Sequence, residues 1–378
     1  MREKIIQAFK EEFDQLPTWI TRSPGRVNII GEHTDYNDGF VLPMTINYAT
    51  WVALQPRRDS QIFIKSLDKD EDLMFDLKQF TNNKGGWQEY IKGVAWALQE
   101  EGLDLLGWEG VFAGNVPIGA GLSSSAALEL ALARAFVLVS GLPWEPHRMA
   151  LSCQKAENLW VGVNSGIMDQ MVSACGKENC ALLIDCRDLN TRQVPLPASA
   201  QIVILDTTTR RGLVDSAYNE RRAQCEAVAQ HFKVDALRDV ALDQLQEQAD
   251  SLDPLLYQRA KHVISENQRV IEAVQAFQEG NLEILGELMN ASHASLRDDY
   301  GVSREEIDQM VAIAQAQPGC FGARLTGAGF GGCAVALVKK GLVDDFQKQV
   351  AREYLSTTGL QPKLYIAKSV PGTTYEKM

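Results

Sequence analysis

The segment NVPIGAGLSSSAALELA, from Asn115 to Ala131, places a glycine loop between a strand-like run and a helix-like run. Gly119 and Gly121 allow backbone conformations that are closed to other residues. Three serines from Ser123 onward stand at the start of the helix, where N-cap residues are favoured. A glycine loop that opens a helix N-terminus presents unpaired N–H groups and the positive end of the helix dipole, and this arrangement binds phosphate. We therefore interpret this first glycine segment as a phosphate-binding loop.

This loop is not of the Walker type, because no GK[ST] sequence follows it. The alternative is a glycine turn followed by an ordinary serine N-cap. One cap residue would suffice for that role, so three consecutive serines exceed the need and favour the phosphate-binding interpretation.

A second glycine segment, LTGAGFGGCAVAL, runs from Leu325 to Leu337. Gly327, Gly329 and Gly332 match the GxGxxG spacing of dinucleotide-binding folds. However, the strand-like run CAVALV follows them, where that fold requires a helix. The match is therefore weak, and a tightly packed bulged hairpin and a loop that lines a ligand site are equal alternatives.

Strand-like and helix-like runs surround the two glycine segments without strict alternation. The predicted strands cover residues 40–55, 61–67, 108–117, 180–186, 192–197, 200–207, 333–338 and 364–370. The predicted helices cover residues 5–16, 87–98, 123–139, 147–162, 165–175, 215–232, 258–277, 281–296 and 343–354. This mixture favours an α+β fold over a doubly wound sheet. The loop near residue 198 is the best boundary between two domains, 1–198 and 199–378.

The composition excludes several classes of function. The 378 residues include 37 Lys and Arg against 49 Asp and Glu, and the net charge of -12 argues against a broad nucleic-acid surface. The seven cysteines are irregularly spaced without a CxxC pair, so we expect reduced, buried thiols rather than disulfides or a zinc site. The N-terminus lacks the apolar core of a signal peptide, and no apolar run reaches the ~18 residues of a membrane span. We therefore expect a cytoplasmic protein that acts on something soluble.

The segment GRVNIIGEHTDYNDG runs from Gly25 to Gly39, and we call its polar run, Glu32–Asp38, the polar turn. One of only five histidines in the chain, His33, stands there beside carboxylates. A solvated loop held by Asx-type hydrogen bonds and a functional site are equal interpretations of this turn alone. Asp169, in NSGIMDQMV, lies among apolar neighbours, and a buried aspartate is costly unless it is paired or used. Taken singly, Glu157 would be a solvated helix residue and Arg26 a surface arginine.

The motifs occur together and in a fixed order: GRVNIIGEHTDYNDG, NVPIGAGLSSSAA, GIMDQ and LTGAGFGG. This set resembles the GHMP small-molecule kinases. The polar turn, YNERR at 218–222 and SHASLRDDY at 292–300 resemble the galactokinase family within them, and the resemblance covers nearly the whole chain. It differs from many members of that family at Ala328, where they carry a further glycine, and at none of the expected catalytic positions.

The resemblance implies a two-domain α+β fold with mixed sheets and an active site at the domain junction. Residues 1–198 would bind sugar and ATP, and residues 199–378 would form the C-terminal kinase domain. The implied reaction transfers the γ-phosphoryl group of ATP to the C1 hydroxyl of α-D-galactose. It gives α-D-galactose 1-phosphate and ADP, the first step of galactose catabolism. We expect the enzyme to be a monomer.

The resemblance also implies roles for individual residues. Asp169 would accept the proton and Arg26 would stabilise the transition state. Hexose hydroxyls both donate and accept hydrogen bonds, so a turn of fixed polar partners would bind galactose and reject the wrong epimer. The implied sugar-binding residues are Glu32, His33, Thr34, Asp35 and Tyr218.

The nucleotide would lie on the first glycine segment. The implied ATP-binding residues are Gly119, Ala120, Gly121, Leu122, Ser123, Ser124 and Ser125. Ser125 and Glu157 would hold Mg²⁺, which prefers oxygen ligands and keeps several waters. Trp87 and Tyr90 would either flank adenine or belong to the core.

Two rival functions are open to the sequence. The glycine segments alone admit another GHMP kinase that acts on N-acetylgalactosamine, another sugar, mevalonate or homoserine, although the polar turn argues against it. The other rival is a galactose- and ATP-binding sensor that has lost catalysis. Such a sensor would be expected to have a damaged serine loop or no base, and here SSSAA and Asp169 are intact.

Overall fold

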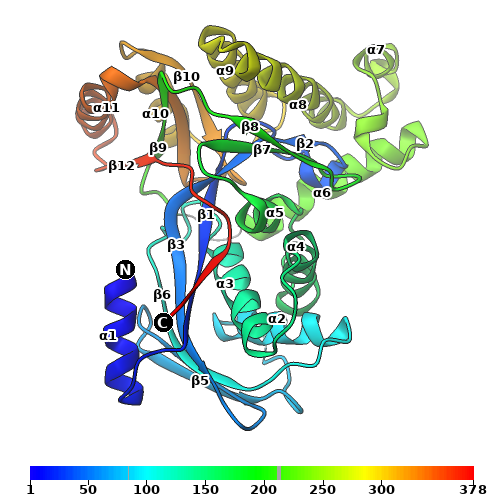
Figure 1. The fold of residues 1–378 in the computed structure, drawn as a ribbon. Coiled ribbons are helices and arrows are strands. Elements are labelled where there is room, and N and C mark those ends of the chain that lie inside the picture. The colour runs from blue at the N-terminus through cyan, green and yellow to red at the C-terminus, as the bar shows by residue number, and fades with distance from the viewer. Residues whose placement is uncertain (84, 211–213) are drawn as a thin grey trace.

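A mixed sheet forms the lower part of the molecule in Figure 1, a computed structural model that describes residues 1–83, 85–210 and 214–378. Its neighbouring strands are antiparallel, except for one parallel pair. In order across the sheet the strands are β13 (Thr374–Lys377), β1 (Trp19–Asn28), β3 (Pro43–Pro56), β6 (Trp108–Gly114), β4 (Gln61–Ser66) and β5 (Glu71–Asp76). The parallel pair is β6 with β4.

Helices cover both faces of this first sheet. On one face α1 (Arg2–Phe13) buries Ile5 and Phe9 against the strands. On the other lies α3 (Ser124–Val139), which is rich in alanine and leucine and buried nearly all round. The helices packed around it are α2 (Gln88–Glu100), α4 (Pro146–Lys155) and α5 (Met168–Cys175). A π-helix, η2 (Ala156–Val161), continues from α4.

Two smaller sheets form the upper part of the molecule. One has the antiparallel order β10 (Cys320–Thr326), β11 (Cys333–Lys339), β9 (Ala200–Asp206), β12 (Lys363–Ala367). The other has the order β2 (Phe40–Val41), β7 (Cys180–Asp185), β8 (Thr191–Pro195). We call the first of these the β9–β12 sheet.

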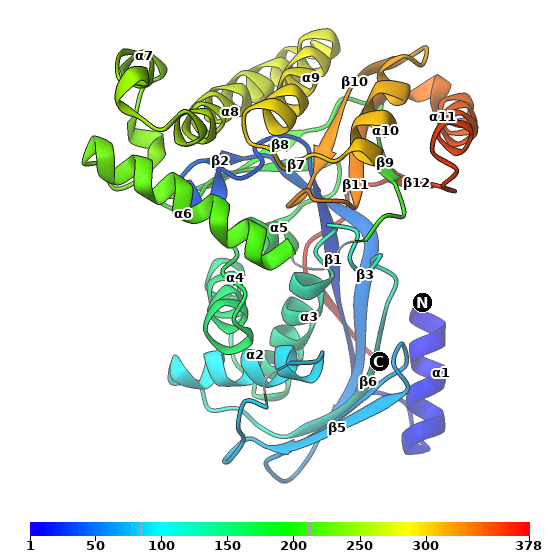
Figure 2. The ribbon, with the colours of Figure 1, turned by 180° about the vertical axis from the view of Figure 1, so that it is seen from behind.

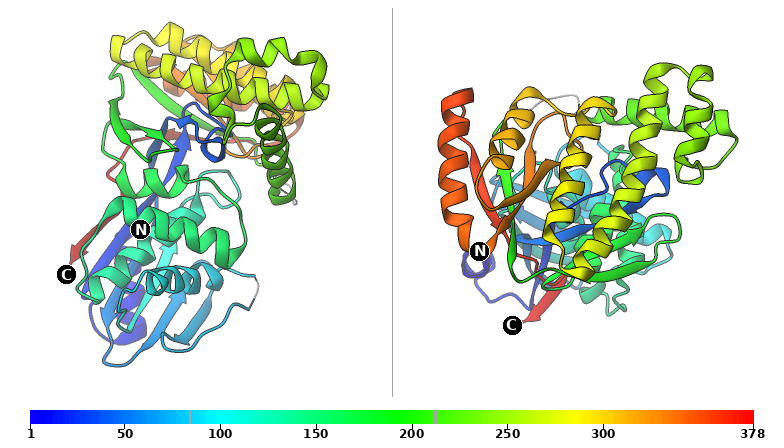
Figure 3. Two further views of the ribbon diagram at one scale, coloured as in Figure 1. Left: turned by 90° about the vertical axis from the view of Figure 1, so that its right-hand side faces the viewer. Right: turned by 90° about the horizontal axis from the view of Figure 1, so that it is seen from above.

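Long helices cover the two smaller sheets. Figure 3 shows α8 (Pro254–Glu279) and α9 (Leu282–Asp298) side by side. Figure 2 shows α6 (Val214–Phe232) between the upper and lower parts of the molecule. The other helices are α7 (Leu242–Glu247), α10 (Glu305–Gln315) and α11 (Val343–Thr358). The 3₁₀ turns are η1 (Asp35–Asn37), η3 (Leu237–Asp239), η4 (Ala249–Ser251) and η5 (Lys340–Leu342).

The end of β1 joins the first sheet to the β9–β12 sheet. Thr326 Oγ1 donates to Asn28 O at 3.0 Å, and Arg324 Nη1 donates to Ile29 O at 3.0 Å. One buried apolar cluster contains Ile29 together with residues of α8 and β11. The polar turn, which follows β1, is therefore placed at the seam between the sheets. The domain boundary near residue 198 stays a prediction.

Most predicted elements are confirmed, including the strand that follows the second glycine segment. The single helix over 147–162 is wrong, because α4 ends at Lys155 and η2 follows. Among the described strands and α-helices, six were not predicted: β1, β5, α7, α10, β10 and β13. In β1 the pairing register shifts between Pro24 and Arg26, so the alternation of a regular strand is broken there.

The thiol prediction is confirmed in part. All seven cysteines lie in the described part of the chain and are free, but only Cys153, Cys186, Cys225 and Cys333 are buried, and the other three are partly exposed. Across residues 1–83, 85–210 and 214–378, no helix is long and apolar enough to cross a membrane.

Candidate active site

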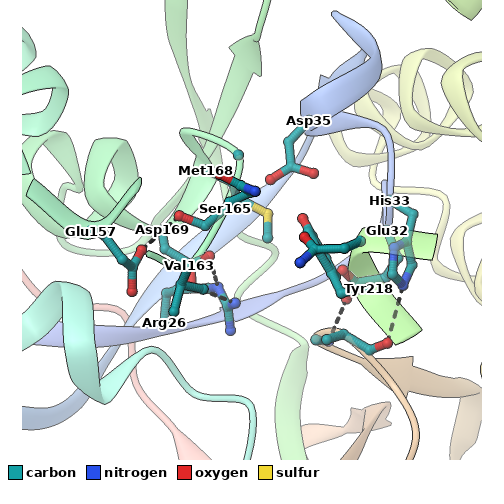
Figure 4. A pocket seen from close by; sticks show the side chains of 15 residues that line it. Arg26, Glu32, His33, Asp35, Glu157, Val163, Ser165, Met168, Asp169 and Tyr218 are labelled. Atoms are coloured by element: carbon teal, nitrogen blue, oxygen red, sulfur yellow. Dashed lines mark hydrogen bonds and ion pairs between the residues drawn. The ribbon is translucent and has the colours of Figure 1, made fainter. Parts of the chain in front are cut away.

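The polar turn, the segment before α5 and the second glycine segment meet around a cavity of about 170 Å³ (Figure 4). We call it the smaller cavity. Of the predicted site residues, its walls contain Arg26, Glu32, His33, Asp35, Glu157, Asp169 and Tyr218. The fold thus brings together residues from β1, the polar turn, η2, α5 and α6, which lie far apart in the sequence.

Arg26 and Asp169 form a two-pronged ion pair in the cavity wall. Arg26 Nε donates to Asp169 Oδ1 at 2.7 Å, and Nη2 donates to Oδ2 at 2.8 Å. The third nitrogen, Nη1, donates to Gly121 O at 2.5 Å, so Arg26 also holds the first glycine segment. Burial lowers the pKa of Arg26, but the charges of Asp169 and Glu32 outweigh this and raise it above its usual value. Arg26 is therefore a fixed cation beside Asp169.

Ser123 does not cap the helix that it precedes. It occupies the N-cap position of α3 with φ 60° and makes no side-chain cap bond. Its hydroxyl donates to Asp169 Oδ2 instead. The ordinary-cap alternative is therefore wrong for Ser123, because a partner distant in sequence holds the hydroxyl.

The first glycine segment separates two further cavities. The larger cavity, of about 980 Å³, is lined by Ser124 and Ser125 at the start of α3 and by Trp87 and Tyr90 at the start of α2. A cavity of about 470 Å³ between the two glycine segments is lined by Gly119, Gly121 and Arg210. Of the predicted ATP-binding residues, Ala120, Leu122 and Ser123 line neither cavity, and Ala120 and Leu122 are buried in the core.

Trp87 has structural partners as well as a place in the larger cavity. Its Nε1 donates to Glu71 Oε2 at 2.7 Å, and its ring lies 5.2 Å from that of Phe112. Glu71 and Phe112 therefore hold the indole in place, and Trp87 still lines the larger cavity.

Glu157 lies where the smaller and larger cavities approach each other. It lines the smaller cavity, whereas its hydrogen-bonding partner Ser125 lines the larger one. Glu157 Oε2 also accepts from Ser165 Oγ at 2.6 Å and from Gln170 Nε2 at 2.8 Å. Burial raises the pKa of Glu157 above its usual value, although the hydrogen bonds of these partners oppose the shift. The π-helical turn η2 carries this carboxylate, as such turns often do at functional sites.

Glu32 and His33 tie the polar turn to the second glycine segment. Glu32 Oε1 accepts from Gly327 N at 2.8 Å and lies 3.2 Å from Nη2 of the fully buried Arg324. His33 Nε2 donates to Ala328 O at 3.1 Å, because a carbonyl can only accept. The second glycine segment is therefore a hairpin loop with a register shift in its strands, and it lines the smaller cavity. Its role in holding a ligand stays a prediction.

His33 is neutral in this arrangement. With Nε2 protonated, Nδ1 accepts from Tyr36 Oη at 2.7 Å. Burial, followed by the neighbouring His262, lowers the pKa of His33 to about 3. Both ring nitrogens thus have protein partners.

The remaining members of the turn differ in their exposure to the smaller cavity. Asp35 lines it, and burial together with the charges of Asp169 and Glu32 raises its pKa to about 7. Thr34 does not line it, because its hydroxyl donates to Phe40 O at 2.7 Å and to Gly31 O at 3.1 Å within the turn.

Tyr218 extends the aromatic wall of the smaller cavity. Its ring lies 5.5 Å from that of His33 and 5.0 Å from that of Tyr36. Burial raises the pKa of Tyr218 well above its usual value, so the phenol keeps its proton.

Several wall and support residues were not predicted from the sequence. Gly166 stands so close to the turn that a Cβ there would lie 2.0 Å from Asp35 Oδ2. Ser165 holds Glu157, and Arg324 approaches Glu32. The sequence offered one local signal, the NSGIMDQ motif around Asp169, but no signal for Arg324, which lies in an apolar strand.

Family models match three parts of the chain. The galactokinase galactose-binding signature matches residues 7–56, which include the polar turn. The GHMP kinase N-terminal domain matches residues 89–177, and the GHMP kinase C-terminal model matches residues 273–356. The first glycine segment lies within the N-terminal match and the second within the C-terminal match.

Whole-chain relatives agree with these models. A galactokinase from Roseiflexus sp. (strain RS-1) is 45% identical over 374 residues, 98% of this chain and 96% of the relative. The crystal structure of Lactococcus lactis galactokinase complexed with galactose has a TM-score of 0.94 and 37% identity, covering 98% of both chains.

A mevalonate kinase from Methanococcus jannaschii shares the fold alone, with a TM-score of 0.67 and 18% identity over 93% of this chain and 98% of the other. The predicted α+β GHMP kinase fold is therefore confirmed. The chain belongs to the galactokinase family of the GHMP kinases, whose members phosphorylate galactose with ATP.

Proposed function

We propose that the smaller cavity binds α-D-galactose and that its C1 hydroxyl receives the γ-phosphoryl group of ATP, giving α-D-galactose 1-phosphate and ADP. The position of Asp169 carries this proposal. Its carboxylate lines the smaller cavity and is held by Arg26, which also donates to the first glycine segment. A base, a cation and a phosphate-binding loop therefore meet at one point.

The sugar would be recognised by groups that are already fixed. Glu32 and Asp35 offer carboxylate acceptors and Tyr218 a phenol, and a wrong epimer would leave such buried groups unpaired. Because both nitrogens of His33 have protein partners, we expect it to contact the sugar with its ring and to hold Ala328 in the wall. We expect Thr34 to act by holding the shape of the turn.

ATP would bind across the first glycine segment. The N–H groups at the start of α3 and the glycine loop would bind its phosphates. Its base would enter the larger cavity, where Trp87 and Tyr90 line the wall. The glycines at 119 and 121, with φ 68° and 75°, adopt the left-handed conformation that favours this residue.

Ser125 and Glu157 have the chemistry to hold Mg²⁺. They offer a hydroxyl and a carboxylate oxygen at the point where the two cavities approach. Within the described residues no cluster of three or more His, Cys, Asp or Glu could hold a metal ion. A two-ligand site suits Mg²⁺, which in kinases takes its remaining ligands from water and nucleotide phosphates and offsets their charge.

In the proposed step, the C1 oxygen bonds to the γ-phosphorus as the bond from that phosphorus to the departing ADP oxygen breaks. Asp169 takes the proton of the C1 hydroxyl. Arg26 keeps Asp169 in place and offsets negative charge on the phosphoryl group. Positioning and electrostatics contribute most of the acceleration in phosphoryl transfer, and a general base typically adds ~10²–10⁴-fold.

The test is ADP release by the wild type and by Asp169→Asn, with Mg-ATP and one acceptor at a time: galactose, glucose, N-acetylgalactosamine, mevalonate or homoserine. We expect turnover mainly with galactose, and a fall in kcat of ~10²–10⁴-fold in the variant with a nearly unchanged KM for galactose. Unchanged turnover in Asp169→Asn would remove this residue from the mechanism. Turnover confined to another acceptor would replace the substrate.

We also propose that the enzyme is a cytoplasmic monomer. Light scattering during size-exclusion chromatography tests the oligomeric state, with an expected mass near 41.8 kDa. A mass of twice this value would contradict the monomer.

A further inference from the structure

Helix α8 anchors the polar turn from outside the smaller cavity. Glu266 Oε1 accepts from Gly31 N at 2.9 Å and from Glu32 N at 3.3 Å. Gly31 has φ 98°, and successive N–H groups in such a turn form a concavity that binds an anion. Here the anion is a side chain of the same protein. Glu266 is fully buried and does not line the cavity.

The Glu266 carboxylate is itself held on both oxygens. Ser292 Oγ donates to Oε1 at 2.7 Å, and Arg269 Nε donates to Oε2 at 2.6 Å. Burial alone would raise the pKa of Glu266, but the charges of Arg269 and Arg324 and the hydrogen bond from Ser292 lower it to about 2. The carboxylate is therefore ionised at neutral pH, which strengthens its hydrogen bonds to the turn.

His262 holds the same peptide from the other side. Its Nε2 donates to Glu32 O at 3.1 Å, and its Nδ1 accepts from Ser295 Oγ at 2.9 Å. His262 and Glu266 are four residues apart on α8 and so lie on one face of the helix. Between them they fix the N–H and the C=O of Glu32, the residue whose side chain enters the cavity wall.

We propose that Glu266 is a positioning residue for sugar recognition: its carboxylate fixes the backbone at Gly31 and Glu32 and thereby the direction of the Glu32 side chain. This inference rests on the proposed function, in which Glu32 contacts galactose. Selectivity for the sugar would then depend in part on α8, a helix outside the smaller cavity.

Glu266→Gln tests this at nearly constant side-chain shape. The glutamine amide has only one acceptor oxygen. Its NH₂ group would therefore face N–H or O–H donors that hydrogen-bond to the carboxylate in the wild type. We expect the KM for galactose to rise on the order of 10–100-fold, as for a hydrogen bond to a charged group. We expect kcat at saturating galactose and the KM for ATP to stay within about twofold. The matched control is Glu272→Gln, an exposed residue of the same helix, which should leave all three constants unchanged.

A double-mutant cycle separates positioning from a general structural effect. Galactose binding is measured calorimetrically without nucleotide for Glu32→Gln, Glu266→Gln and the double variant. If Glu266 acts through Glu32, the double variant binds galactose only slightly less tightly than Glu32→Gln alone. Losses that simply multiply would overturn the inference.

Ser292→Ala keeps the inference testable if Glu266→Gln fails to fold. It removes one hydroxyl that holds Glu266 and should raise the KM for galactose about threefold to tenfold. An unchanged KM in the folded variants, with weak galactose binding by Glu32→Gln, would sink this inference alone. Normal galactose binding by Glu32→Gln would instead sink the proposed sugar site.

Discussion

The polar turn and the first glycine segment face each other across Asp169, and they are held in different ways. The turn is buried and tied to elements more than two hundred residues away, through Glu266, Arg324 and Gly327. The glycine segment is partly exposed, with Ile118 at 68% exposure, and Arg26 of the neighbouring strand holds it at Gly121. The polar turn is thus preorganised by the whole fold, whereas the first glycine segment is shaped by its own glycines.

This difference bears on selectivity. A site that must discriminate between epimers gains from hydrogen-bonding groups that cannot move. A loop that wraps phosphates needs only backbone N–H groups and room for them. We therefore expect substitutions in the polar turn and in the first glycine segment to alter different kinetic constants.

The largest effect should come from Asp35→Asn. The pKa of Asp35 is raised from 3.8 to about 7, so the folded state binds a proton that the unfolded state releases. The contribution of this group to stability is therefore present below about pH 4 and is lost as the pH rises through 7. The variant should be more stable than the wild type at pH 8, by up to about 4 kcal/mol, yet bind galactose more weakly.

Urea unfolding of both proteins at pH 5 and pH 8 measures this effect, and the advantage of the variant should widen as the pH rises. Asp250→Asn, at an exposed position, is the control and should show no such widening. If the stability advantage of the variant over the wild type were the same at pH 5 and pH 8, the pKa of Asp35 would not be raised in the folded protein.

Two glycine substitutions should separate the two sides. In Gly166→Ala the new Cβ would lie 2.0 Å from Asp35 Oδ2, and in Gly25→Ala it would lie 2.6 Å from Leu122 O. A displacement of about 1 Å can cost ~10²-fold. We expect Gly166→Ala to raise the KM for galactose on the order of 10–100-fold, and Gly25→Ala to raise the KM for ATP and lower kcat.

Steady-state kinetics with each substrate varied in turn distinguishes these outcomes. Gly341→Ala is the control, because a Cβ there would meet no atom within 4 Å. If both test variants changed the same constants, the two sides would not be mechanically separate.

The smallest effect should come from Ser123→Ala. Loss of the hydroxyl that donates to Asp169 should lower kcat about threefold to tenfold. Since this serine makes no cap bond, Tm should stay unchanged. Asn281→Ala, which removes a true cap at Ile284 N, should show the reverse: a loss of ~1 kcal/mol of stability with normal kcat. A lower Tm in Ser123→Ala would restore its role as a cap.

The sequence predicts elements whose pattern is local and regular. Helix α3 follows from its alanine and leucine content, and the strand after the second glycine segment follows from its apolar run. Strand β1 was not predicted, because Pro24 and Gly25 interrupt its sequence pattern and its pairing register shifts there. Strands β5 and β13 are short and lie at the sheet edges: β5 buries only Leu73 and Phe75, and β13 is exposed throughout, so neither has a pattern long enough to predict a strand.

The predicted site residues come from motifs, and what was missed is their support. Ser123 has the sequence of a cap, but the contact with Asp169 overrides that local preference. Glu266 and Arg324 carry no motif, and their roles depend on contacts with residues 31 and 32 that only the fold creates. Local patterns thus indicate which groups line the smaller cavity but not which groups hold them in position.

Strand β13 gives the molecule an unusual order of assembly. It lies at the C-terminal end of the chain (Figure 1) and pairs with β1 along Trp19–Arg22. Beside it, Arg2 Nε donates to Glu376 Oε2 at 2.8 Å. During synthesis β1 is made about 350 residues before β13, so the edge that pairs with β13 stays open until residues 374–377 have been made. An open edge of this kind can pair with other chains, so the nascent protein is exposed to misassociation through the strand that carries Arg26.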